Sequence, residues 1–302
     1  MLCRKLVCGA LFFLMGTCLL LAEDAEPAPE KPAEDDPKKN TLKIGNLAFA
    51  ESQQPGPLVS IGQNVLNKLQ AQAALMPVEF KGHDQYSVAL FSNLFYGFTD
   101  ELTFLVSVPT AVPFAQDDHR SYGVSDVILQ LEYAFYTKYY TTYYDQATFI
   151  ASMTLPTGSA TKNPPTGTGA NSFFLGGTLS RMGIDWFYFI SGGGIMNASS
   201  HGQKHGDQAL YQCGIGRRIL NTEEWLLDWM VEFDGYYACR DRDHGVSDPN
   251  SGGNVIYITP SLWLSSTHVI YQIGIGFPVQ QTLFGHQNKN HCLIIGNFAW
   301  TF

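Results

Sequence analysis

The stretch DVILQLEYAFY, residues 126–136, alternates between two kinds of side chain with a period of two. One face carries Val127, Leu129, Leu131, Tyr133 and Phe135, and the other carries Asp126, Gln130, Glu132 and Ala134. Successive side chains of a β-strand point to opposite faces of its sheet, so the pattern predicts a strand with one apolar and one polar face. The segments EWLLDWMVEFD, residues 224–234, and HVIYQIGIGF, residues 268–277, repeat it.

Runs of this kind continue from Leu69 to the end of the chain. They predict twelve strands, near residues 69–80, 86–96, 101–109, 122–136, 146–155, 171–181, 185–197, 208–219, 224–239, 253–264, 268–278 and 291–302. The links GFTD, MGI, LNTE and SST are short, TKYYTTYYD is of middling length, and links such as PTGSATKNPPTGTGA and RDRDHGVSDPNSG are long and polar. Short turns at one end and long loops at the other are typical of outer-membrane barrels.

The composition favours the same class of protein. Charged residues make up 15% of the chain, against about a quarter in soluble proteins, and glycine, phenylalanine and tyrosine are frequent. In a bilayer, strands leave no backbone group unpaired only when the sheet closes on itself. We therefore expect an all-β fold, a transmembrane antiparallel up-and-down β-barrel of about 12 strands in the bacterial outer membrane, with the lipid bilayer as partner. The net charge of -9 argues against a nucleic-acid partner.

The first 68 residues predict three segments before the barrel. Arg4 and Lys5 precede an uncharged apolar run, which indicates a signal peptide over residues 1–22. Residues 23–42 form an acidic, proline-rich stretch typical of a disordered linker. Residues 43–68 are interrupted by prolines, yet apolar residues follow a helical spacing toward Leu69. They predict a helix at the periplasmic mouth, a plug in the lumen or an extended lead-in to a barrel over residues 69–302.

The chain ends in HCLIIGNFAWTF, with apolar side chains at every second position. Phe298, Trp300 and Phe302 fall on one face of the expected last strand and would meet lipid. This spacing resembles the C-terminal signal of bacterial outer-membrane proteins. The resemblance implies recognition by the barrel-assembly machinery.

The polar faces of the strands predict what lines the lumen. Charged candidates are Glu132, Asp228, Glu232, Asp234, Arg218 and His268, and aromatic candidates are Phe187, Phe189, Tyr257 and Trp263. An acidic lumen favours cations over anions, although such groups also occur as hydrogen-bonded filling of a packed interior.

Sites for other chemistry are poorly supported. His201 and His205 are four residues apart, but no third metal ligand is evident, so we expect no metal and no cofactor. A hydrolase would need a nucleophile and a base that lie close together. No spacing in the sequence links a particular serine to a particular histidine, and there is no GxSxG motif. Cys213, Cys239 and Cys292, which follow the expected signal peptide, form no C-x-x-C pair, and their pairing stays open.

Three stretches resemble a known family. GVSDVILQLEYAFY (residues 123–136) followed by ATFIASMTLPTGS (147–159), and later SLWLSSTHVIYQIGIGFPVQQ (261–281), are similar to outer-membrane β-barrel transporters grouped as "meta-pathway of phenol degradation" proteins. The resemblance implies a single barrel that moves small, often hydrophobic or aromatic, compounds, and it implies no catalytic residues.

The sequence thus favours a channel or transporter for passive passage of small solutes. The alternative is a closed, surface-exposed barrel acting through its long loops in adhesion or structural support. An outer-membrane lipid hydrolase is the least favoured class.

Overall fold

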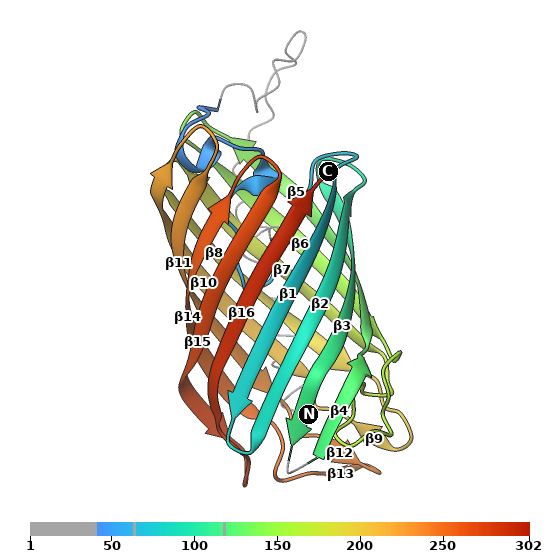
Figure 1. Ribbon diagram of the computed structural model, residues 1–302. Helices are drawn as coiled ribbons and strands as arrows, with labels where there is room; N and C mark the ends of the chain where they lie inside the picture. The colour runs from blue at the N-terminus through green and yellow to red at the C-terminus, as the bar shows by residue number, and fades with distance from the viewer. Residues whose placement is uncertain (1–40, 63–64, 117–118) are drawn as a thin grey trace, which may run out of the picture.

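The computed structural model describes residues 41–62, 65–116 and 119–302, and the expected signal peptide and most of the expected linker lie outside these ranges. Twelve long antiparallel strands form one barrel (Figure 1). They are β1 (Ala71–Gly82), β2 (Gln85–Gly97), β3 (Leu102–Gln116), β5 (Val127–Tyr139), β6 (Tyr143–Leu155), β7 (Ser172–Gly183), β8 (Trp186–Asn197), β10 (Gln208–Asn221), β11 (Leu226–Ala238), β14 (Gly253–Ser265), β15 (Val269–Leu283) and β16 (Asn290–Thr301). The prediction of an antiparallel barrel of about twelve strands is confirmed.

The barrel closes between its first and last strands. β1 pairs with β2 on one side and with β16 on the other, in a register that runs from Gln72 opposite Thr301 to Lys81 opposite Cys292. The backbone N–H of Phe302 also donates to the carbonyl of Ala71, at 2.8 Å. The edges that an open sheet would expose are therefore paired, as a bilayer requires.

Strand pairing continues beyond the predicted boundaries at the long-loop end. β3 runs on to Gln116 and pairs there with β4 (His119–Val124), where a loop was expected, and β15 reaches Leu283. The expected strand over 122–136 is interrupted at Ser125 and Asp126 and is split between β4 and β5. Outside the membrane a hairpin needs no alternating apolar face, so hydrophobic periodicity does not mark these extensions.

The links are sorted by end. Residues 98–101, 140–142, 184–185, 222–225 and 266–268 make the short-turn end, where the C-terminus lies (Figure 1). Residues 156–171, 198–207, 239–252 and 284–289 join strands at the long-loop end, and three two-residue strands there, β9 (Gln203–Lys204), β12 (Arg242–Asp243) and β13 (Val246–Ser247), form a separate small sheet. The tight β1–β2 turn at residues 83–84 is the exception at that end.

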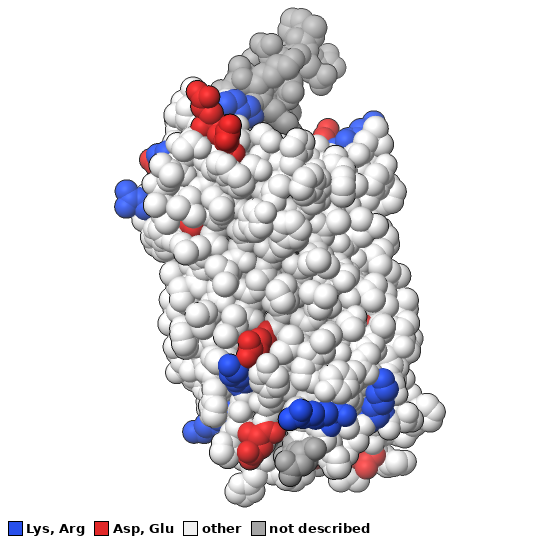
Figure 2. Space-filling view, in the orientation of Figure 1, with Lys and Arg blue, Asp and Glu red and all other residues white. Residues whose placement is uncertain are grey.

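The outer face of the barrel is apolar. Exposed large side chains alternate with buried ones along the strands, for example Leu94, Leu131, Phe149, Phe173, Ile190, Ile215, Phe233, Leu262, Ile273 and Phe277. On the face seen in Figure 2, charged side chains gather toward the two ends, and the surface between them is mostly uncharged. Such a belt is stable against hydrocarbon and costly in water.

In the part of the chain described, no helix has the length and apolar character needed to cross a membrane.

Candidate functional site: the occupied lumen

Residues 41–62 and 65–70, here named the inner segment, begin and end at the short-turn end of the barrel. The N–H of Leu42 donates to the carbonyl of Thr141 (3.0 Å), and the N–H of Asn46 donates to that of Ile184 (2.9 Å), both in short turns. After two short 3-10 helices, η2 (Gly45–Leu47) and η3 (Glu51–Gln53), the segment runs into the lumen. It returns to the same end, where the N–H of Leu69 donates to the carbonyl of Gly97 (2.8 Å) just before β1.

The descending arm of the inner segment is bonded to the wall along its way. Near the short-turn end, Gln53 Nε2 donates to Thr301 Oγ1 (2.6 Å), and Ser265 Oγ donates to the Gln53 carbonyl (2.7 Å). Deeper in, Gln272 Nε2 donates to the carbonyl of Gly56 (3.1 Å). The order of these wall residues along β14, β15 and β16 shows a chain that descends into the barrel.

Glu232, a fully buried residue near the middle of β11, binds three successive residues of the inner segment. Its carboxylate accepts the backbone N–H groups of Leu58 (2.8 Å), Val59 (3.2 Å) and Ser60 (2.9 Å). Successive N–H groups that converge on one point make an anion-binding concavity, and charge-assisted hydrogen bonds are about twice as strong as neutral ones. These three N–H groups lie outside any strand and have no backbone partner among the residues that the structure describes, and the carboxylate of Glu232 supplies the acceptor that they need.

Asp234, two residues after Glu232 on the same strand, also binds the inner segment. Its carboxylate accepts the hydroxyls of Ser60 (2.6 Å) and Thr259 (3.2 Å) and the side-chain amide of Gln212 (3.3 Å). Gln212 in turn accepts the N–H of Ile61 (3.0 Å). The two carboxylates and the amide on β10 and β11 form one polar wall that fixes Leu58–Ile61.

The strands on either side of β10 and β11 hold the same bend by close approach. Thr178 Oγ1, on β7, donates to the carbonyl of Ile61 (2.8 Å). Gly62 has φ +97°, and a Cβ there would lie 2.1 Å from Thr178 Oγ1; a Cβ on Gly274 would lie 2.6 Å from Leu58 Cδ2. Glycine alone fits position 62, and a side chain at position 274 would displace the end of Leu58, so the bend and the barrel wall lie in close contact.

At the short-turn end, both polar and apolar contacts hold the inner segment. Tyr139 Oη donates to Glu51 Oε1 (2.6 Å), and Tyr144 Oη donates to Gln54 Oε1 (2.9 Å). Leu47 belongs to an apolar cluster with Tyr144, Met182, Phe187, Phe189 and Met230. Leu66 belongs to a second cluster with Ala74, Phe95, Trp263, Ile270 and Ala299.

The structure places the predicted lumen carboxylates inside the barrel. Glu132, Asp228, Glu232 and Asp234 are all buried, and so are the aromatic candidates Phe187, Phe189, Tyr257 and Trp263. Glu232 and Asp234 come together around the inner segment, whereas Asp228 lies toward the short-turn end, opposite Trp263 in the register.

The two basic candidates lie near the rim, and Arg218, opposite Asp228 in the register, shares the inward face of that residue. Arg218 Nε donates to Asp185 Oδ1 (3.0 Å), in the turn between β7 and β8. His268 is exposed in the turn before β15, which begins at Val269, so the expected position of His268 in the lumen is corrected. Strand parity assigns a face only inside a strand, and this boundary falls one residue later than predicted.

The sequence of the inner segment predicts its structure only weakly. The described residues between Val59 and Leu69 form no helix, and the apolar spacing of Val65, Leu66 and Leu69 reflects contacts with the barrel interior. Sequence reasoning also missed Gln212 and Thr178 as partners of the segment. Both are polar residues on inward-facing strand positions, and that alternation is the signal that would have found them.

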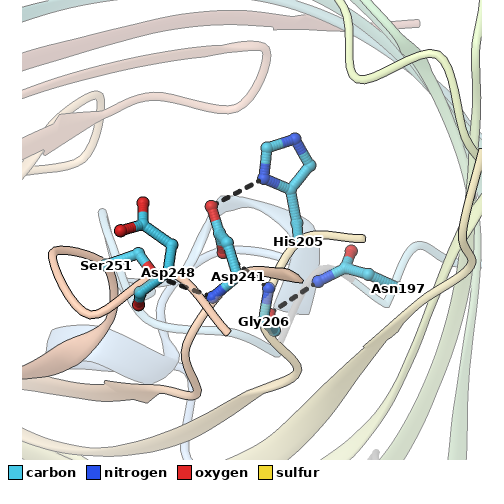
Figure 3. A network of polar contacts seen from close by, with 6 residues as sticks. All are labelled: Asn197, His205, Gly206, Asp241, Asp248 and Ser251. Carbon is cyan, nitrogen blue, oxygen red and sulfur yellow. Dashed lines mark hydrogen bonds and ion pairs between the residues drawn. The ribbon is translucent and has the colours of Figure 1, made fainter. Parts of the chain in front are cut away.

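The long-loop end carries a folded polar network (Figure 3). Asp241 accepts the N–H of Gly206 (2.7 Å) and lies 3.2 Å from His205 Nδ1, while its own N–H donates to Ser251 Oγ (2.8 Å). Asn197 Nδ2 donates to the carbonyl of Gly206 (2.8 Å). Two long loops are therefore tied to each other at this end.

The ring of His205 has a hydrogen-bond partner in Asp241. Hydrogen bonding to Asp241 raises the pKa of His205, and the same bond lowers the pKa of Asp241. No group of three or more metal-ligating side chains occurs among residues 41–62, 65–116 and 119–302. Cys213 and Cys292 are free thiols, so they do not bridge to each other.

Comparison with known proteins shows the fold. No protein-family model matches the sequence, and no curated protein matches it either, so the resemblance to the phenol-degradation group stays a prediction. The structure is similar to the COG4313 outer membrane channel from Pseudomonas putida F1, with a TM-score of 0.66 at 12% identity over 82% of this chain and 99% of that one.

Two further solved structures are less similar. The NanC porin has a TM-score of 0.45 at 10% identity over 76% of this chain and 98% of its own, and the CymD monoaromatic hydrocarbon channel has 0.37 at 10% identity over 85% and 97%. The closed sheet, the apolar belt and the likeness in fold to the COG4313 channel make the protein a β-barrel of the bacterial outer membrane. In barrels of this class the short turns face the periplasm.

Proposed function

We propose that the protein is an outer-membrane channel or transporter for passive passage of small solutes, and that displacement of the inner segment opens it. The observation that carries the proposal is the way the lumen is filled. Its centre is occupied by a bend of the chain outside the β-strands, held by side-chain hydrogen bonds. A barrel filled by its own strand side chains has no such removable part.

The lining supports a preference among solutes. Four carboxylates face the interior, and acidic rings in a pore favour cations over anions. Phe187 and Phe189 stack at 5.6 Å between ring centroids on the same wall, next to Tyr144 and Met230. We infer that small neutral or cationic solutes with an apolar or aromatic part pass, one at a time, and that anions are disfavoured.

Recordings from planar bilayers test the proposal. The full processed protein should show rare openings, and a variant in which residues 45–62 are replaced by a glycine-serine linker of equal length should conduct most of the time. Liposome swelling with the linker variant should be faster for neutral aromatic solutes than for organic anions of the same size. If the linker variant folds, resists protease in vesicles and still passes neither ions nor solutes, the channel proposal is refuted.

The second candidate is a closed barrel that acts at the cell surface through its loops. The folded loop network of Figure 3 and the buried carboxylate of Asp126, which accepts the N–H groups of Gly158 (2.9 Å) and Thr168 (2.7 Å), favour it. Such order suits a binding surface. A silent linker variant in the recordings would leave this candidate as the better one.

Assembly of the barrel is part of the proposal. Phe298, Trp300 and Phe302 all point outward from the end of the chain, with Phe302 70% exposed. This leaves them accessible to the barrel-assembly machinery. Replacing all three by alanine should lower the amount of folded protein in the outer membrane, measured by heat-modifiable gel mobility, without preventing refolding of the purified chain in detergent.

A further inference from the structure

A groove lies on the lipid-facing side of strands β5 to β8, near the periplasmic rim. Its volume is about 680 Å³. Its outward-facing lining includes Phe135, Tyr136, Ala147, Leu179, Tyr188 and Ile190. The groove is hollow because Ala147 stands in register between the larger Tyr136 and Leu179, beside a bulge in β5 at residues 134–136.

Alternation along the strands shows that the groove and its charged neighbours face outward. Tyr144 and Met182 point into the barrel, where they contact Leu47 of the inner segment. The adjacent residues Asp145 and Arg181 therefore lie on the outer face.

A row of charges closes the periplasmic end of the groove. The register places Lys138 opposite Asp145 and Asp145 opposite Arg181, and partners across a ladder share a face. Arg181 Nη2 donates to Asp145 Oδ2 at 2.7 Å. Two cations beside one carboxylate leave this end with a net positive charge.

Aromatic rings hold these cations at the level of the lipid headgroups. Lys138 Nζ lies 5.3 Å from the ring centroid of Tyr140, and Arg181 Cζ lies 4.4 Å from that of Tyr143. Farther round the rim, Arg217 Cζ lies 4.9 Å from the ring of Trp186. Tyrosine and tryptophan mark the membrane interface, so the cations stand where lipid phosphates lie.

We propose that this groove binds an anionic glycerophospholipid of the periplasmic leaflet. One acyl chain lies along Ala147 between Tyr136 and Leu179. The phosphate accepts from Lys138 and from the guanidinium donors of Arg181 that Asp145 leaves free. Arg presents five N–H donors, and its carboxylate partner uses two of them.

Lipid retention measured by native mass spectrometry tests the site. The full processed protein is reconstituted in vesicles of equal parts phosphatidylglycerol and phosphatidylethanolamine, extracted into mild detergent and weighed. The wild type should keep phosphatidylglycerol in preference to phosphatidylethanolamine. Each removed cation, as in Lys138→Gln or Arg181→Gln, should lower that retention by about fivefold.

Two further variants separate the groove from general surface charge. Ala147→Phe fills the groove and leaves every charge in place, and it should also lose the lipid. Lys81→Gln removes an exposed cation paired with Glu79 on β1, near the long-loop end, and should keep it. If Arg181→Gln fails to fold, Lys138→Gln gives the same measurement with the Arg181–Asp145 pair intact. Equal retention of the two lipids by the wild type, or unchanged retention in Lys138→Gln and Ala147→Phe, overturns the proposal.

Discussion

Replacing Glu232 by alanine should release the inner segment from the lumen. The carboxylate accepts three backbone N–H groups at 2.8 to 3.2 Å, and alanine leaves all three without that acceptor. An unsatisfied buried donor costs about 1–3 kcal/mol, and water that enters the vacated space recovers part of this. We therefore expect docking of the segment to weaken by about 3 kcal/mol, which raises the undocked population roughly 100-fold.

Two assays measure that population. Open probability in planar bilayers should rise in Glu232→Ala. Maleimide labelling of Val59→Cys, in a background where Cys213, Cys239 and Cys292 are serine, should become faster by a similar factor. Val59 suits the label because it uses its backbone, and not its side chain, to bond Glu232.

The matched control is Glu79→Ala, since Glu79 is paired with Lys81 (2.8 Å) on β1. It should change neither measurement. If Glu232→Ala folds and its labelling rate and open probability stay within twofold of this control, then the three hydrogen bonds do not hold the segment and the reasoning fails.

Other predictions concern the lumen, the belt and the loops. Asp228→Asn in the linker variant should reduce the preference for cations, seen as a reversal potential closer to zero in a KCl gradient, whereas Glu79→Gln should not shift it. Ile273→Arg puts a charge on the lipid face of β15, where the residue is 58% exposed, and should destabilise the barrel by about 2–4 kcal/mol in denaturant titrations in vesicles. Val246→Arg, at an exposed position of the two-residue strand β13 at the long-loop end, should cost under about 0.5 kcal/mol. The His205–Asp241 pair stabilises the loops most between about pH 4 and 6.5. Because the pKa of His205 is raised in the folded protein, its contribution to stability is complete below the ordinary pKa of histidine and is lost as the pH rises through the raised pKa. Because the pKa of Asp241 is lowered in the folded protein, its contribution is complete above the ordinary pKa of aspartate and is lost as the pH falls through the lowered pKa. Proteolysis of residues 239–252 should therefore be slowest in that window, by a small factor because both groups are partly exposed, and Asp241→Asn should abolish the minimum.

The sequence was most informative where one side of a strand met lipid. A period of two marks each spanning strand, and the same alternation places Glu132 and Glu232 on the inner face. It was least informative for Gly56–Gly62, because that stretch has no period and is bonded mainly through its backbone. The identity of side chains says little about which backbone N–H groups will meet a carboxylate more than 170 residues away.

The inner segment is continuous with β1, and that covalent link has a consequence for how the pore works. When the bend leaves its place it stays tied to the barrel wall through Gln70 and Ala71. A tethered blocker returns at a local concentration on the order of millimolar, whatever the amount of protein in the membrane. Each barrel should thus open and reseal on its own, in brief events whose frequency is independent of its neighbours.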